Sequence, residues 1–121
     1  MKLPEGAKCI RWADVPAEEV FAGMQRQRVD AQQMTVVRYT YGPGVDFPTH
    51  SHPEEQVVLV LSGEIDFTVS GAPVAATAGS VLVIPPGLAH SARVRGKVTV
   101  DTLNVLSPRR TKDIVFHESK Q

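Results

Sequence analysis

The sequence predicts an all-β fold, a β-sandwich or β-barrel, and three observations carry this prediction. Short stretches rich in β-branched and aromatic residues recur from Met34 onward. Glycine and proline separate these stretches at close intervals. A sustained helical period is missing from the same region. We therefore expect one domain over residues 1–121, with its core at about residues 34–108.

The strands follow one another along the chain after a mixed N-terminal segment, residues 1–33. Within that segment, Pro16 and Gly23 suit the start and the end of a short helix. Residues 34–41 form the first expected strand, which ends at Gly42-Pro43-Gly44. Residues 56–61 and 64–70 flank Ser62-Gly63 and predict a hairpin. Further short strands are expected at residues 80–86, 90–94 and 97–106.

Composition and charge narrow the class of partner. Hydrophobic residues make up 42% and charged residues 21%, which is ordinary for a soluble globular protein. The chain has 13 Lys plus Arg and 13 Asp plus Glu and lacks a basic stripe, which argues against nucleic acid and anionic membranes as partners. The single cysteine, Cys9, cannot form an internal disulfide, and the first residues lack the apolar region of a signal peptide. We therefore expect a cytoplasmic protein.

Three histidines in the strand-rich region have the spacing of metal ligands. His50 and His52 lie two residues apart, so in an extended chain both imidazoles face the same side. Gln56 shares their parity, and His90 starts a later strand that barrel closure could bring opposite the pair. Imidazoles with an oxygen donor suit one divalent metal ion per chain, and nickel, zinc, iron and manganese all accept such ligands.

Two longer motifs contain these residues and resemble those of the cupin family. Gly44-x5-His50-x-His52-x3-Gln56-x6-Gly63 is similar to the first cupin motif, with Gln56 in place of the usual Glu. Gly79-x5-Pro85-x-Gly87-x2-His90 is similar to the second, which normally ends in Asn where this chain has Val94. The resemblance implies a cupin (RmlC-like) jelly-roll barrel with a metal ion in its mouth, bound by His50, His52, Gln56 and His90. The four motif glycines are expected at turns that need a positive φ.

The stretch from His50 to Gln56 also resembles the His-x-His-Pro-x-x-Gln version found in the pectin-degradation (KdgF-like) branch. This resemblance implies a metal-dependent enzyme that linearises unsaturated uronates. The branch's proposed catalytic Asp falls on Asn104 and its substrate-carboxylate Arg falls on Arg110. Asn cannot act as a general base at ordinary pH. Asp101 lies nearby in sequence, but its parity directs it to the other side of the strand.

Three functions remain open from the sequence. The first is a metal-dependent enzyme that acts as a Lewis acid on a small sugar acid or other organic acid, because a neutral Gln56 leaves the full charge on the ion. The second is a non-haem metal dioxygenase of the quercetinase-like cupins. The third is a non-catalytic cupin that binds a small ligand. In each case we expect a small molecule in the barrel and a homodimer, with residues 1–33 as a candidate for crossing onto the neighbour.

Other conspicuous residues have simpler interpretations. Trp12, Tyr39, Tyr41, Phe47 and Phe67 are expected to pack in the core or at an interface. The two carboxylates that follow Pro53, Glu54 and Glu55, are expected to be solvated, with the alternative that either substitutes for a missing carboxylate in the site. Arg109 is expected on the surface, and His117 in a polar tail that Ile114, Val115 and Phe116 could pin down. For Asn104 and Arg110 the competing interpretations are a structural amide and a solvated tail charge.

Overall fold

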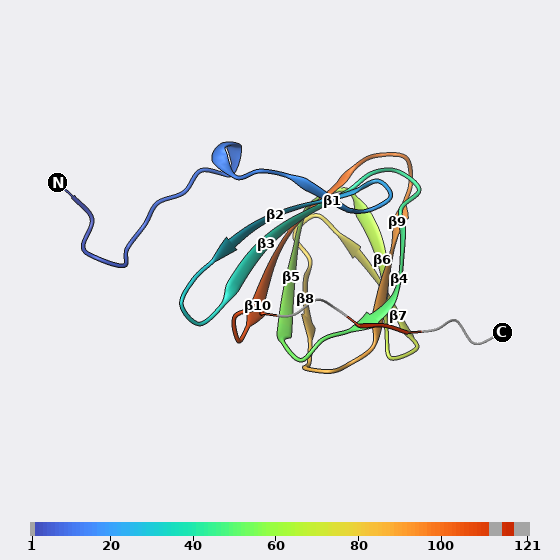
Figure 1. Cartoon of the computed structure of the whole chain (residues 1–121). Helices are drawn as coiled ribbons and strands as arrows, with labels where there is room; N and C mark the ends of the chain where they lie inside the picture. The colour runs from blue at the N-terminus through green and yellow to red at the C-terminus, as the bar shows by residue number, and fades with distance from the viewer. Residues whose placement is uncertain (1, 112–114, 118–121) are drawn as a thin grey trace.

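The computed structural model describes residues 2–111 and 115–117. Two antiparallel sheets face each other and form a jelly-roll barrel, which confirms the predicted all-β class (Figure 1). The first sheet contains, in spatial order, β1 (Glu18–Phe21), β2 (Met24–Asp30), β3 (Thr35–Tyr41), β10 (Val100–Ser107), β5 (Glu55–Ser62) and β8 (Val81–Ile84). The second contains β11 (Val115–Phe116), β4 (Asp46–Ser51), β9 (His90–Arg95), β6 (Glu64–Val69) and β7 (Ala72–Thr77).

The core lies between the two sheets and follows the two-residue alternation of the strands. In β3 every second residue from Thr35 to Tyr41 is buried, and β10 alternates in the same way from Val100 to Leu106. The largest fully buried apolar side chains are Met24, Ile65, Ile84, Leu106, Val37, Val58 and Val100. The expected packing of aromatic side chains is confirmed for Tyr39, Tyr41, Phe47 and Phe67, while Trp12 is half-buried.

The helix predicted between Pro16 and Gly23 is wrong. The described helical structure in this segment is a single 3₁₀ turn at Trp12–Asp14, and residues 18–21 form strand β1. β1 pairs with β2 around Gly23, whose φ of +80° is one that glycine adopts without strain. An isolated helix of two turns is marginal in water, and pairing with β2 supplies both a backbone ladder and the Glu18–Arg26 ion pair.

The hairpin predicted across Ser62-Gly63 is also wrong, although both of its strands exist. β5 lies in the first sheet and β6 in the second, so the chain crosses from one sheet to the other at Gly63. Gly63 has a φ of +86°, and a Cβ there would lie 2.8 Å from a Val100 methyl group. The two-residue hairpin lies instead at Ser70-Gly71, where β6 turns into β7 with positive φ at both residues.

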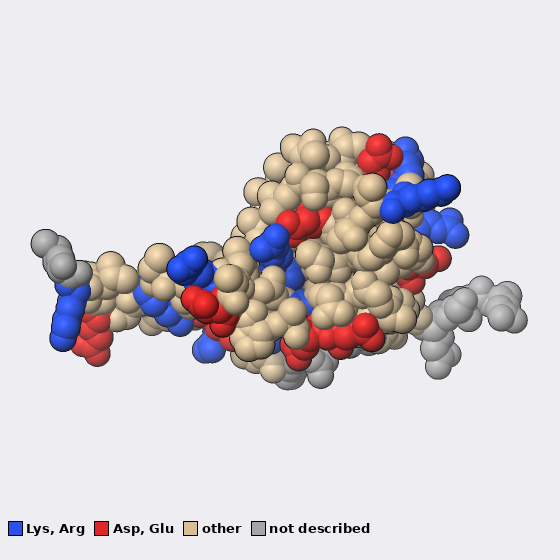
Figure 2. Space-filling view, turned by 90° about the horizontal axis from the view of Figure 1, so that it is seen from above, with Lys and Arg blue, Asp and Glu red and all other residues tan. Residues whose placement is uncertain are grey.

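The surface of the described chain is mixed in charge. Figure 2 shows Lys and Arg side chains interspersed with Asp and Glu over the barrel and the N-terminal segment. Residues 2–11, before the 3₁₀ turn, extend away from the barrel (Figure 1) and expose Leu3 and Ile10. Among the described residues, no helix is long and apolar enough to cross a bilayer.

Candidate metal centre

Pairing between β4 and β9 brings the three motif histidines together. His50 is the direct partner of His90 in this antiparallel pair, and His52 follows immediately after the end of β4. The three side chains are buried, with residue exposures of 7%, 5% and 4% for His50, His52 and His90. One ligand nitrogen from each lies within 4.8 Å of the others. The predicted convergence of His50, His52 and His90 is therefore confirmed.

Backbone carbonyls hold the Nδ1 atom of each ring. His50 Nδ1 lies 2.9 Å from the carbonyl oxygen of Pro48, and His90 Nδ1 lies 2.8 Å from that of Leu88. His52 Nδ1 lies 3.1 Å from the carbonyl oxygen of Glu54. Because a carbonyl can only accept a hydrogen bond, each Nδ1 carries the hydrogen and each Nε2 presents a lone pair. The rings are thus set in the tautomer that binds a metal through Nε2.

Burial keeps these imidazoles neutral. It lowers the pKa of His50 to about 3, with His90 contributing through charge repulsion, and it lowers the pKa of His90 to about 4. Burial and then the Arg110 charge lower the pKa of His52. Within the described residues, His90 Nε2 is a buried nitrogen without a hydrogen-bond partner. Three neutral imidazoles, one with an orphaned lone pair, fit a divalent first-row metal ion.

Gln56 and Asn104 lie beside the histidines in a buried chain of polar contacts. Gln56 Oε1 is 2.9 Å from His52 Nε2, and Gln56 Nε2 donates to Asn104 Oδ1 at 2.9 Å. Asn104 Nδ2 in turn donates to the carbonyl oxygen of Val37 at 3.3 Å and to Thr102 Oγ1 at 3.0 Å. Asn104 is fully buried, so it fits the interpretation as a structural amide. Asp101, as predicted, points to the opposite face of β10, where it pairs with Arg38.

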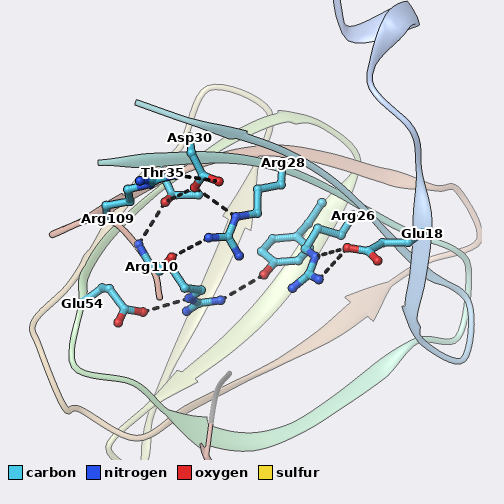
Figure 3. A network of polar contacts seen from close by, with 9 residues as sticks. Glu18, Arg26, Arg28, Asp30, Thr35, Glu54, Arg109 and Arg110 are labelled. Carbon is cyan, nitrogen blue, oxygen red and sulfur yellow. Dashed lines mark hydrogen bonds and ion pairs between the residues drawn. The ribbon is translucent and has the colours of Figure 1, made fainter. Parts of the chain in front are cut away.

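Arg110 and Glu54 form a buried ion pair, which Figure 3 shows. Arg110 Nε donates to Glu54 Oε1 at 2.8 Å, and the two side chains are only 5% and 4% exposed. Arg110 Nη1 lies 3.5 Å from the Tyr39 hydroxyl, and Arg28 donates to the Arg110 carbonyl oxygen. The expectations of a solvated Glu54 and of a solvated tail charge at Arg110 are therefore wrong. Each charge is desolvated by the barrel and neutralised by the other.

The sequence therefore favoured a solvated Glu54 and offered a role in the site only as the alternative for either acid after Pro53. One signal was available, because Glu54 lies two residues from both His52 and Gln56 and shares their parity. Its Oε1 is 3.8 Å from His52 Nδ1, on the side of the ring away from Gln56. Glu55, Arg109 and His117 are exposed, in line with expectation. His117 Nε2 contacts Ser51 Oγ at 2.8 Å, and the preceding strand β11 pairs with β4. Ile114 lies outside the described residues.

A small cavity opens onto these groups. Its volume is about 20 Å³, room for one or two water-sized groups. The histidines, Gln56 and Arg110 share its wall with apolar and aromatic side chains, namely Met24, Tyr39, Tyr41, Phe47, Phe67 and Ala92. Asn104 lies behind Gln56 and is not among these lining residues. The polar groups therefore converge on a largely apolar lining, as in small-molecule sites, but the enclosed space itself admits only a small group of a ligand.

Comparison with known protein families agrees with this geometry. The model of the cupin domain family matches residues 37–106, more than half of the chain. The chain is a cupin. The matched region runs from β3 to β10 and includes His50, His52, Gln56 and His90.

Several solved structures share this cupin fold. An RmlC-like cupin from Shewanella frigidimarina is 25% identical, with a TM-score of 0.74, and the match covers 81% of this chain and 87% of that one. KdgF from a Halomonas species is 21% identical with a TM-score of 0.79, covering 86% and 96%. The polyketide cyclase RemF from Streptomyces resistomycificus is 21% identical with a TM-score of 0.81, covering 95% and 88%. A comparison with curated protein sequences found no match.

Proposed function

We propose that this cupin is a metal-dependent enzyme that acts on a small sugar acid or a related organic acid, in the manner of the KdgF-like branch. The observation that carries the proposal is the placement of Arg110. Arg110 is buried and lines the same cavity as the three histidines. A buried guanidinium beside a Lewis-acid site suits a substrate that carries a carboxylate.

The proposed ligand set is His50, His52, Gln56 and His90. When bound, the divalent ion supplies a Lewis acid for a substrate hydroxyl or carbonyl oxygen. The histidines contribute no charge, because burial lowers all three pKa values, to about 3 for His50 and about 4 for His90. Gln56 contributes none either, so the ligands leave the charge of the ion undiminished.

Arg110 and Tyr39 are the side chains that we assign to the substrate. Arg110 uses Nε for Glu54 and Nη1 for Tyr39, which leaves further N–H groups of its fork for a carboxylate. Tyr39 lines the cavity, and its hydroxyl accepts from Arg110, which leaves the hydroxyl hydrogen available to a bound molecule. Tyr39 therefore takes the proton-transfer role that an Asn at position 104 cannot perform. Glu54 holds Arg110 in place.

The test is a turnover assay with unsaturated uronates. The purified protein is loaded with zinc, nickel, manganese or iron, mixed with monomers released by a pectate or alginate lyase, and followed by loss of the double-bond absorbance. We expect metal-dependent loss in the wild type, with none in His50→Ala and a raised KM in Arg110→Met. Glu55→Gln, an exposed neighbour of the site, serves as the control. Absence of turnover with every metal would refute the proposed reaction. Oxygen uptake with iron and a phenolic substrate would favour the dioxygenase instead.

We also propose that the protein is a homodimer. The support is an apolar strip at the β8 edge of the first sheet, where Leu61, Val81 and Val83 are exposed. Val81 and Val83 face outward beside Leu59 and Val57 of β5. Light scattering of the purified chain should give twice the monomer mass, and Val83→Lys should shift the mass toward the monomer. A monomeric wild type would contradict this proposal.

A further inference from the structure

We infer that Asn104 is a positioning residue that turns the Gln56 amide so that its oxygen, rather than its NH2 group, faces the metal centre. The inference rests on the proposed metal site and assigns a role to a residue that does not line the cavity. Its evidence is which atom donates and which accepts in each hydrogen bond between β3 and His52. These roles can be assigned one contact after another, from the β3 carbonyl oxygens to the His52 ring.

The donor and acceptor roles are set first by two backbone carbonyl oxygens of β3. Thr102 Oγ1 donates its hydrogen to the carbonyl oxygen of Tyr39 at 3.0 Å, so toward Asn104 the same oxygen can only accept. The carbonyl oxygen of Val37, the other neighbour of Asn104 Nδ2, can also only accept. The NH2 group of Asn104 must therefore face β3, and its Oδ1 must face Gln56. A reversed amide would place Oδ1 against two acceptors in a fully buried position, which is costly.

The orientation of Gln56 follows from that of Asn104. Because Asn104 presents an oxygen, Gln56 must present its NH2 group to it, at 2.9 Å. Gln56 Oε1 then faces His52 Nε2 at 2.9 Å. The hydrogen of His52 already lies on Nδ1, which faces the carbonyl oxygen of Glu54. Two atoms that both present lone pairs therefore stand within contact distance. A cation bound by both relieves their repulsion.

Strand register maintains the arrangement, because Asn104 pairs directly with Val37 and Thr102 pairs directly with Tyr39. The sheet itself therefore determines which atom of Gln56 is presented to the ion.

This geometry also gives a physical reason for Asn at position 104. An Asp there could accept from Gln56 Nε2, but its second oxygen would face the carbonyl oxygen of Val37 and Thr102 Oγ1. Asn satisfies all three contacts while it remains neutral in a fully buried position. The amide at 104 and the amide at 56 thus act as a matched pair. Asn104 therefore orients the Gln56 side chain and transfers no proton.

The test uses cobalt(II) alone as the probe, because its visible spectrum reports the ligand set. We compare the wild type with Asn104→Leu, Gln56→Leu and the double variant by metal titration and absorption. Loss of a partner that orients a ligand typically weakens metal binding by about 10–100-fold. We expect Asn104→Leu to lose affinity in that range and to take the spectrum of Gln56→Leu. The double variant should bind no more weakly than Gln56→Leu.

Two further variants separate positioning from general damage to the barrel. Asn104→Asp keeps an acceptor for Gln56 Nε2, so it should retain the wild-type cobalt spectrum even though the fold is less stable. Thr102→Val removes one bond of Asn104 but leaves the Val37 carbonyl to orient it, so its affinity should stay close to that of wild type. Wild-type affinity and spectrum in Asn104→Leu would overturn the inference while leaving the metal site intact. Failure of the wild type to bind cobalt would overturn the metal site and this role together.

If Asn104→Leu does not fold, the wild type alone decides the question. In the zinc-loaded protein, nuclear Overhauser effects from the side-chain amide protons of Gln56 should reach the Asn104 side chain. Effects that reach the His52 ring instead would show the amide in the opposite orientation and overturn the inference.

Discussion

The buried ion pair between Glu54 and Arg110 makes a quantitative prediction about stability. Glu54→Gln keeps the size of the side chain but leaves the Arg110 guanidinium without its charge partner in a position that is only 5% exposed. Breaking a buried pair in this way costs about 3–5 kcal/mol, because the remaining charge stays desolvated. We expect that loss in the free energy of unfolding of the metal-free protein.

The loss converts into a shift in melting temperature. For 121 residues, an unfolding entropy of about 2.1 cal/mol/K per residue gives about 250 cal/mol/K. A loss of about 3–5 kcal/mol then lowers Tm by about 12–20 °C. Glu55→Gln, which removes the adjacent exposed carboxylate, should leave Tm close to the wild-type value.

Urea and thermal unfolding with chelator present measure the effect without a contribution from bound metal. Arg110→Met should be destabilised to a similar extent, since it strands Glu54. The double variant Glu54→Gln/Arg110→Met should recover much of the loss, because neither charge remains. A Glu54→Gln loss below about 1 kcal/mol, the range of exposed pairs, would refute the buried-pair reasoning. Additive losses in the double variant would refute it as well.

Three other predictions concern pH, metal and backbone strain. Below pH 6.5 the unfolded chain takes up protons that His50 and His90, with folded-state pKa values of about 3 and 4, do not. The free energy of unfolding of the metal-free protein should therefore reach its full value above pH 6.5. Below that pH it should fall by about 1.4 kcal/mol per pH unit for each histidine, down to about pH 4. A urea midpoint that does not change with pH would contradict this. Metal at 100 times its Kd should raise the unfolding free energy by about 2.7 kcal/mol, a gain that chelator or His50→Ala abolishes in calorimetry. Gly63→Ala should lower the urea midpoint clearly more than Gly71→Ala, because both have positive φ but only at Gly63 does the new Cβ meet Val100 and Thr99.

The sequence predicted those features that local pattern encodes. Alternation and turn residues indicated most of the strands, and the spacing of His50 and His52 placed both rings on one side of a strand. The positive φ values expected at the motif glycines are observed at Gly44, Gly63, Gly79 and Gly87. The placement of His90 beside His50 and His52 could be expected only from barrel closure and from the cupin resemblance. The residues around His90 do not themselves indicate its partner. In the structure that placement depends on the register of β4 against β9.

The errors share one cause, which is that pairing partners are not encoded locally. Ser62-Gly63 has the composition of a hairpin turn, yet β5 pairs with β10 on one side and with β8 on the other, so β6 does not pair with it. Glu54 was expected in solvent because its partner, Arg110, lies 56 residues further along the chain. Burial of a charge becomes predictable only when the opposite charge is known to arrive at the same place.

The balance of charge links the two proposals about the site. Among the described residues, the group that could hold a metal consists of three histidines, and no carboxylate joins it. Glu54, the nearest acid in the described contacts, is committed to Arg110, so the pair adds no net charge to the centre. An ion held by neutral imidazoles and the Gln56 amide would therefore keep its full positive charge in a buried chamber. A bound carboxylate would supply the negative charge that the ligands lack. Positioning of the Gln56 oxygen by Asn104 would thus favour an anionic substrate, because it completes the ligand set without adding a competing carboxylate.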